Sequence, residues 1–148
     1  MKKLAHCAVL ALAALLVTTG GHAKEYEVQM LNQGPDGSMV FKPAFLKVSP
    51  GDTVHFVPTD AGHNSKAVVV PGGGESWQGA IGEKVSVTLN TEGVYIYQCD
   101  PHLMMGMVGV IQVGSATNHN AAKRKAASLK SQMSMNAARM DAYMSQVE

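Results

Sequence analysis

Short apolar segments separated by turn-forming residues fill most of the chain from residue 26 to residue 113. This spacing restricts the possible fold more than any other feature of the sequence. Clusters of Gly, Pro, Asn and Asp lie between the segments, and Pro43 divides one of them, as expected of an edge or bent strand. About seven or eight short strands at such spacing predict an antiparallel β-sandwich or barrel. The apolar segments are 26–31, 39–52, 52–58, 67–70, 84–90, 93–99 and 107–113.

The C-terminal tail has a different pattern. From about Asn118 onward it contains no Gly or Pro, and apolar residues recur every three or four positions. This is one apolar stripe of a helix, expected to pack on the sandwich. Copper storage by the tail's four methionines is the alternative, but all except Met135 follow the helical spacing. The stripe consists of Ala122, Ala126, Leu129, Met133, Ala137, Met140, Met144 and Val147.

The N-terminal sequence is typical of a secretory signal peptide. Lys2 and Lys3 precede an apolar run over residues 8–17, and small residues follow at Gly21 and Ala23. This order predicts cleavage after Ala23, and the apolar run is too short for a comfortable membrane span. A retained membrane anchor is the alternative. The predicted organisation is a signal peptide at 1–23, a β-sandwich at 24–114 and a helical extension of the same domain at 115–148.

Cleavage would leave 125 residues, which is enough for a hydrophobic core. Without Lys2 and Lys3, 10 of the 12 basic residues remain against 11 acidic ones, a net charge of −1. That balance gives no indication of nucleic-acid binding. Cys7 would leave with the signal peptide, so Cys99 would have no partner for an internal disulfide. An exported lone thiol needs protection, by burial or by metal ligation.

Cys99 lies in the segment YQCDPHLMMGMVG, residues 97–109, which allows three kinds of chemistry. In the first, Cys99 is a nucleophile and His102 is its base, but no third residue stands out to orient the pair. The second, covalent haem attachment, requires C-x-x-C-H and is excluded because the second cysteine is missing. The third is a metal site. In that case C-x-x-H lets a thiolate and an imidazole meet one ion across a turn that Pro101 helps to fix.

Two further ligands complete the predicted metal site. Met107 follows at the start of the next strand and can present its sulfur from the same side. Among the remaining histidines, His63 lies in a loop just beyond a strand end, whereas His55 lies within a strand pattern and His119 in the tail. His63 is therefore the best candidate for the missing strong ligand.

The donor types indicate which metal is bound. A structural zinc site has four strong ligands, usually Cys or His. One thiolate, two imidazoles and a weak axial thioether are the arrangement of type-1 blue copper, which transfers single electrons. Such a site leaves no open position for a substrate, so an electron carrier is expected rather than an enzyme.

Two segments resemble the cupredoxin family, and within it most closely the pseudoazurins. They are residues 30–64, ending in the His-Asn pair, and residues 93–114, with a C-x2-H-x4-M loop. The similarity covers nearly all of the chain after the signal peptide, and the helical tail separates it from plastocyanin-like chains. The resemblance implies an eight-stranded Greek-key sandwich with C-terminal helices packed on one sheet. It also implies one type-1 copper ion, cycling between Cu(II) and Cu(I), on His63, Cys99, His102 and Met107.

The resemblance further implies a soluble periplasmic electron shuttle whose partner is copper nitrite reductase or a related denitrification enzyme. A monomer is expected, with no membrane attachment after signal cleavage. Pseudoazurins surround the copper face with lysines, but the corresponding positions here are Gln33, Ala61 and Gln98, while Lys42 and Lys66 remain. A periplasmic copper chaperone or scavenger using the same ligands is the alternative function.

Individual roles follow for residues around the ligands. His102 lies in the exposed loop, so its edge is the expected electron port, whereas His63 is expected to be more buried. Asn64 is a candidate to donate a hydrogen bond to the Cys99 sulfur, through its backbone or its side chain. An apolar patch for brief docking of redox proteins is expected around His102. Its predicted members are Met39, Pro101, Leu103, Met104 and Met105.

Overall fold

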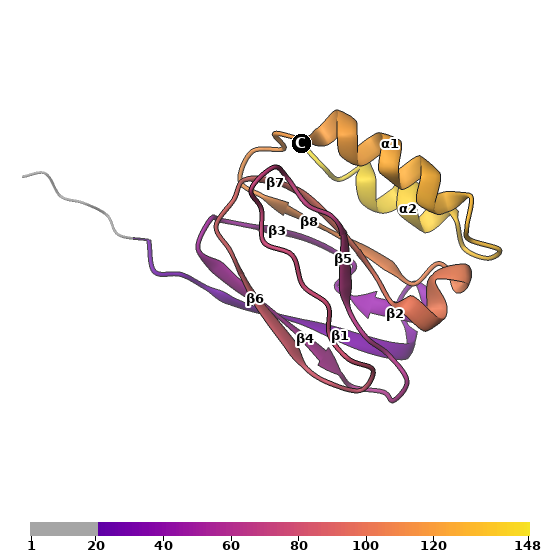
Figure 1. Ribbon diagram of the computed structural model, residues 1–148. Helices are drawn as coiled ribbons and strands as arrows, with labels where there is room; N and C mark the ends of the chain where they lie inside the picture. The colour runs from indigo at the N-terminus through magenta and orange to yellow at the C-terminus, as the bar shows by residue number, and fades with distance from the viewer. Residues whose placement is uncertain (1–20) are drawn as a thin grey trace, which may run out of the picture.

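Two four-stranded β-sheets pack face to face, and two helices cover the outer face of one of them (Figure 1). The computed structural model describes residues 21–148, so most of the predicted signal peptide, with Cys7, lies outside the described residues. The first sheet has the order β2-β1-β4-β6, and the second β3-β8-β7-β5. The strands are β1 (Glu25–Gly34), β2 (Gly37–Lys42), β3 (Phe45–Val48), β4 (Asp52–Pro58), β5 (Lys66–Val69), β6 (Val85–Leu89), β7 (Gly93–Gln98) and β8 (Val108–Val113).

The sandwich predicted from the strand spacing is confirmed, including the division at Pro43. The chain changes sheet at the cis Lys42–Pro43 peptide, so β2 and β3 become edge strands of opposite sheets. The expectation of purely antiparallel sheets was wrong, because β1 pairs with β4 and β3 with β8 in parallel. Because the chain crosses between the sheets, β4 comes to lie beside β1, and β8 beside β3, in the same direction. Apolar spacing along the chain carries no information about that direction.

Aromatic and branched side chains fill the space between the sheets, and Tyr97 lies at their centre. Its ring packs edge-on against Phe41 and Phe56, with centroids 4.8 and 4.9 Å apart. Opposite Tyr97 in the β7–β8 ladder stands Gly109, where a Cβ would lie 2.2 Å from Tyr97 Cζ. The glycine makes room for the ring, and the ring holds β7 in place just before Cys99.

We predict that Gly109→Ala destabilises the protein by about 1–3 kcal/mol, the usual cost of overpacking a core. The added methyl group would meet a ring that Phe41 and Phe56 hold in place, so backbone must shift to relieve the contact. Urea denaturation followed by fluorescence measures the change. Gly72→Ala is the matched control, since its Cβ would meet nothing within 4 Å. Equal stability of the two variants would show that the Tyr97 ring can move aside.

The apolar stripe of the tail packs on the outer face of the second sheet, as predicted. It forms two helices, α1 (His119–Lys130) and α2 (Ala138–Met144), rather than one. Asn136 adopts a left-handed φ of 55° in the linker between them, which reverses the chain so that both halves of the stripe meet the sheet. Met133, Met140 and Met144 are buried there, while Met135 is 52% exposed. The packing role of these three methionines is confirmed.

Both faces of β7 and β8 are therefore covered, and every residue of β8 is buried. Buried strands on each side of the 99–107 loop give that loop a rigid base. Within residues 21–148, no helix combines the length and the apolar character needed to cross a membrane.

Candidate metal centre

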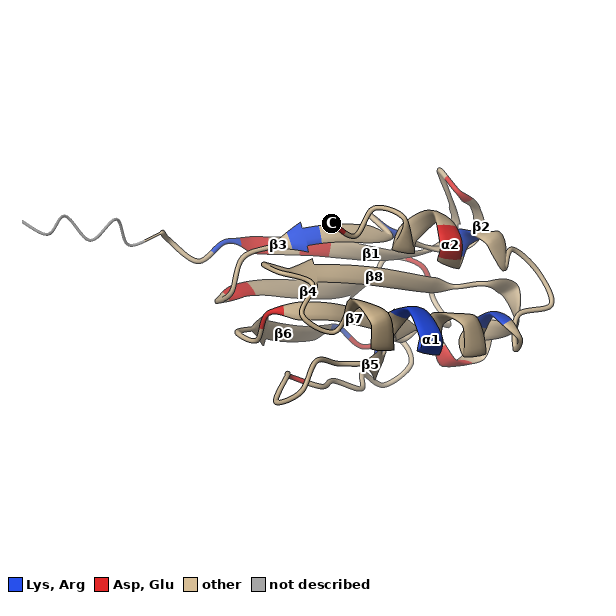
Figure 2. Ribbon diagram, turned by 90° about the horizontal axis from the view of Figure 1, so that it is seen from above, with Lys and Arg blue, Asp and Glu red and all other residues tan. Residues whose placement is uncertain are grey.

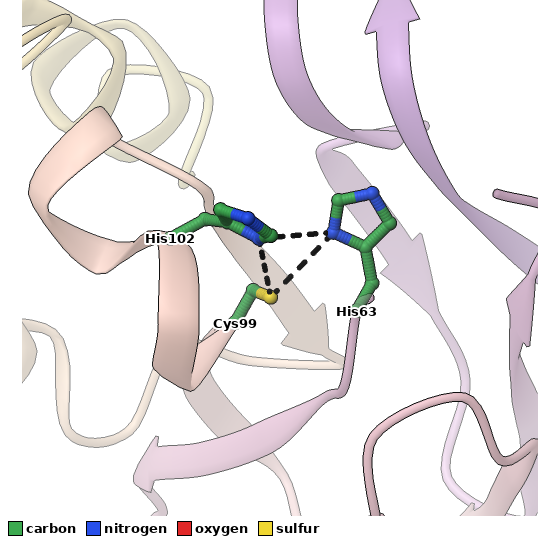
Figure 3. A group of neighbouring side chains, drawn as sticks. All are labelled: His63, Cys99 and His102. Carbon is green, nitrogen blue, oxygen red and sulfur yellow. Dashed lines mark hydrogen bonds between the residues drawn. The ribbon is translucent and has the colours of Figure 1, made fainter. Parts of the chain in front are cut away.

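Three side chains from separate parts of the sequence converge at one end of the sandwich (Figure 3). His63 comes from the loop between β4 and β5, Cys99 directly follows β7, and His102 lies in the short 3-10 helix η1 (Asp100–Met105). The two histidine Nδ1 atoms are 3.1 Å apart. Cys99 Sγ lies 3.4 Å from Nδ1 of His102 and 3.7 Å from Nδ1 of His63. The structure thus brings three of the four predicted ligands, His63, Cys99 and His102, together in one triangle of donor atoms.

The size of this triangle fits a single metal ion. Zinc, for example, binds imidazole nitrogen at about 2.0–2.1 Å and thiolate sulfur at about 2.3 Å. Three donors that surround one ion at those lengths lie between about 3 and 4 Å from one another, as these atoms do. A soft sulfur with two imidazoles suits copper. His55 and His119 are not part of the group, and His55 Nδ1 instead contacts Ser86 Oγ at 2.7 Å.

Backbone hydrogen bonds shape the loop that carries Cys99 and His102. Pro101 occupies the first turn of η1, and the His102 amide donates to the Cys99 carbonyl at 3.1 Å. Gly106 ends the turn with a left-handed φ of 76°. The Cys99 amide then donates to the Met107 carbonyl at 3.1 Å, so the loop closes as β8 begins. Met107 is fully buried at that closure.

The orientation of His63 is set by Asn32, which the sequence analysis missed. His63 Nε2 lies 3.0 Å from Asn32 Oδ1. The amide oxygen can only accept, so Nε2 carries the proton and the lone pair of Nδ1 points toward the other two donors. Burial, followed by the nearby His102, lowers the pKa of His63 and favours this neutral form. Asn32 has no distinguishing sequence signal, because it sits in β1, distant in sequence from every ligand.

Asn64 connects the His63 loop to the Cys99 loop. The backbone of Asn64 acts to lower the pKa of the Cys99 thiol, and the predicted hydrogen bond from Asn64 to the sulfur stays a prediction. The Asn64 side chain bonds Asp100 instead of the sulfur: Oδ1 accepts from the Asp100 amide at 2.8 Å, and Nδ2 donates to Asp100 Oδ2 at 3.1 Å. Asn64 is 4% exposed, whereas Asp100 lies at the surface, so these bonds are shielded from water only on the Asn64 side.

Burial raises the pKa of the Cys99 thiol, although the backbone groups of Asn64 and His102 oppose the shift. The metal-free thiol is therefore protonated at pH 7, whereas a metal-bound sulfur is a thiolate. We predict that copper binding releases one proton from Cys99 and none from His63, which is already neutral. The proton of Cys99 by itself makes copper affinity rise about tenfold per pH unit near neutrality. Below the lowered pKa of His63 a second proton competes and the slope steepens.

Isothermal titration of copper in buffers with different ionisation enthalpies measures this proton count. Because Cys99 is the proposed source of the released proton, Cys99→Ser is the control and should release no proton from this position. A wild-type count near zero at pH 7 would contradict the protonated thiol.

Solvent reaches the centre through His102. His63, Cys99 and Met107 have no exposed surface, while His102 is partly exposed. This difference was predicted from the loop position of His102. Beside it, Met104 is 63% exposed, Pro101 is exposed, and Leu103, Met39 and Met105 are partly buried. Ile81 is also exposed, to 61%, and it was not among the predicted members of the apolar patch. The next residue, Gly82, donates its amide hydrogen to the His63 carbonyl at 2.8 Å, so this loop lies against the His63 loop.

Comparisons with known proteins agree with this geometry. Residues 28–114 match the family of copper-binding proteins that includes plastocyanin and azurin. The chain is 44% identical over 146 residues to a pseudoazurin of Paracoccus pantotrophus, covering 96% of this chain and 97% of that one. The crystal structure of native pseudoazurin from Hyphomicrobium denitrificans superposes with a TM-score of 0.70 at 36% identity, covering 84% of this chain and 98% of that one. For the pseudoazurin of Methylobacterium extorquens the TM-score is 0.65 at 44% identity, with coverages of 67% and 83%.

Proposed function

Because the chain belongs to the plastocyanin/azurin family of copper-binding proteins, and within it to the pseudoazurins, we propose that its type-1 copper is held by His63, Cys99, His102 and Met107. Membership makes the chain a blue copper electron-transfer protein rather than an enzyme. The triangle of donor atoms from the first three residues carries the proposal. Met107 is added because it is buried at the loop closure and completes the C-x2-H-x4-M motif.

A copper ion held by these four residues would supply the exchange of single electrons. The residues of the chain make that exchange possible in three ways. Cys99, His63 and Met107 exclude water because none of them has exposed surface. Asn32 and Asn64 fix the donor directions, so little rearrangement accompanies the change of charge. His102 provides the partly exposed edge through which the electron enters and leaves.

Redox proteins are the partners, and they are proposed to dock on the apolar patch around His102. The patch is small and has few free charges, which suits brief contacts. Lys66, at the start of β5, lies 3.8 Å from Asp100 Oδ1 and is partly neutralised. Burial tends to raise the pKa of Asp100, but hydrogen bonds from Gln98 and Asn64 and the charge of Lys66 outweigh it, so this carboxyl is ionised. Successive basic residues instead lie on α1 (Figure 2).

Copper nitrite reductase is the proposed acceptor, and stopped-flow mixing with the reduced protein tests it. We expect a second-order rate that falls severalfold in Met104→Ser and depends only weakly on ionic strength. Val70→Ser is the matched control, since Val70 is an exposed apolar residue that directly follows β5. An equal loss in both variants would remove the His102 patch as the docking face. No electron transfer at any concentration would exclude this acceptor.

Export to the periplasm with cleavage after Ala23 is also proposed. The Lys24 backbone nitrogen donates to Asp52 Oδ1 at 2.8 Å, and Asp52 is only 3% exposed. Cleavage of the Ala23–Lys24 peptide bond would turn the Lys24 amide into a charged amino group. That group would lie beside the buried Asp52 carboxylate, a favourable pairing. Mass spectrometry of the periplasmic fraction should find a chain that begins at Lys24. An intact N-terminus in that fraction would contradict the proposal.

A further inference from the structure

The linker between α1 and α2 lies directly against the ligand loop. The amides of Ser134 and Met135 donate to the Met104 carbonyl at 2.9 and 3.0 Å. Asn136 Nδ2 donates to the Met105 carbonyl at 3.0 Å. The approach is so close that a Cβ on Gly106 would lie 2.9 Å from the Met135 carbonyl oxygen. The C-terminal extension thus contacts the residues that immediately precede Met107.

Arg139, a buried residue of α2, adds to the contact between the C-terminal extension and the ligand loop. Arg139 is 9% exposed, and its guanidinium has no carboxylate partner in the described part of the chain but donates to five backbone carbonyls. Three belong to the β1–β2 hairpin: Asp36 at 2.6 Å, Ser38 at 3.0 Å and Met39 at 3.1 Å. The other two, longer bonds reach the ligand loop at Gly106, 3.4 Å, and Met105, 3.5 Å. One side chain therefore joins the hairpin, α2 and the ligand loop.

The Gly106 carbonyl belongs to the peptide unit that also contains the Met107 amide. That amide donates to the His102 carbonyl at 3.2 Å. The plane of this peptide is therefore held from both sides: its oxygen accepts from the Val108 amide at 3.1 Å and from Arg139 at 3.4 Å, and its nitrogen donates to His102. Since the Met107 Cα lies in this peptide plane, the plane fixes the point from which the Met107 side chain leaves the backbone.

Anchoring of α2 does not require these bonds to the ligand loop. Met140, Tyr143 and Met144 already pack α2 against the sheet. Tyr143 also donates from its hydroxyl to Asp36 Oδ2 at 2.9 Å, which ties the helix to the same hairpin. The additional bonds from Arg139 and Asn136 to residues 105 and 106 act on the loop rather than on the helix.

We propose that Arg139, assisted by Asn136, is a positioning residue for Met107, and that the C-terminal extension thereby tunes the reduction potential of the centre. The inference rests on the proposed role of Met107 as the axial ligand. The axial sulfur tunes the potential of such sites. A loosened Met107 donates less electron density to the oxidised ion, so the potential should rise.

Three variants separate positioning from anchoring. Arg139→Met removes the guanidinium donors and keeps an unbranched side chain. Asn136→Gly removes the amide but tolerates the left-handed backbone. Tyr143→Phe is the matched control, because it weakens the tie between α2 and the hairpin without touching residues 105 or 106. Each variant is measured by voltammetry with copper bound, and by hydrogen exchange of the Met107 amide in the metal-free protein.

We expect Arg139→Met and Asn136→Gly to raise the potential and to speed Met107 amide exchange at least tenfold relative to Tyr143→Phe. An unchanged or lowered potential, with Met107 exchange equal to that of Tyr143→Phe, would show that Arg139 only anchors the helix. If Arg139→Met does not fold, Asn136→Gly alone decides. Failure of the wild-type protein to form a redox-active copper centre would count against the proposed function. Hydrogen exchange of the Met107 amide in the metal-free protein would still test whether Arg139 and Asn136 hold the ligand loop.

Discussion

Cys99→Ser should abolish the intense visible absorption of the copper-loaded protein while leaving the fold intact. The absorption of type-1 copper depends on a thiolate bound to the oxidised ion, and a serine hydroxyl neither ionises near neutral pH nor provides a soft donor. Cys99 is fully buried, but serine differs from cysteine in a single side-chain atom, so the packing changes only slightly. Absorption spectra after copper addition and dialysis, with circular dichroism for the fold, measure both effects.

His55→Ala and His119→Ala are the controls, and both should keep the full colour. His55 belongs to an exposed network with Ser86 and Glu25, and His119 begins α1. Loss of colour in either control would mean that His63 was the wrong choice for the second imidazole. Persistent colour in Cys99→Ser would rule out a copper–thiolate bond from this residue.

Asn64→Ala should weaken copper binding by about 10–100-fold, the usual effect of removing a partner that orients metal ligands. It should also lower the free energy of unfolding by about 1–3 kcal/mol, because the Asp100 amide loses its buried acceptor. Both losses arise from the same change, since the amide group links the His63 loop to the Cys99 loop. Competition with a copper chelator and urea denaturation of the metal-free protein measure them separately.

Gln98→Ala is the matched control for Asn64. Gln98 Nε2 donates to Asp100 Oδ1 at 2.9 Å, but this bond lies at the surface and leaves the Asp100 amide untouched. We expect copper affinity within about twofold of the wild type for this variant, since surface changes have small effects. An equal loss of affinity in both variants would indicate that the charge environment of Asp100, rather than the link between loops, governs copper binding.

The parts of the fold that depend on local pattern were predictable from sequence. The bounds of β4, the division at Pro43 and the buried stripe of the tail all follow from apolar spacing and turn residues. The parallel pairing of β1 with β4 was not predictable, because the direction of a neighbouring strand depends on how the chain crosses between sheets. The helix break at Asn136 also escaped detection, since the linker contains no Gly or Pro and its conformation depends on contacts with the ligand loop.

The same distinction holds for the metal centre. Cys99 and His102 share one short motif, and His63 could be selected because a loop beyond a strand end can reach the same pole. Asn32 and Arg139 could not be found in this way. Both are single polar residues in strand or helix segments, and they become important only through contacts with residues distant in sequence.

Reconstitution with one equivalent of Cu(II), followed by repeated reduction and oxidation, tests whether the protein is a copper electron carrier. We expect an intense visible band at one copper per chain, bleached by ascorbate and restored by an oxidant, with copper still bound after gel filtration. Copper that leaves on reduction would favour a chaperone or scavenger. A colourless protein that binds zinc with the same stoichiometry would contradict a copper electron carrier altogether.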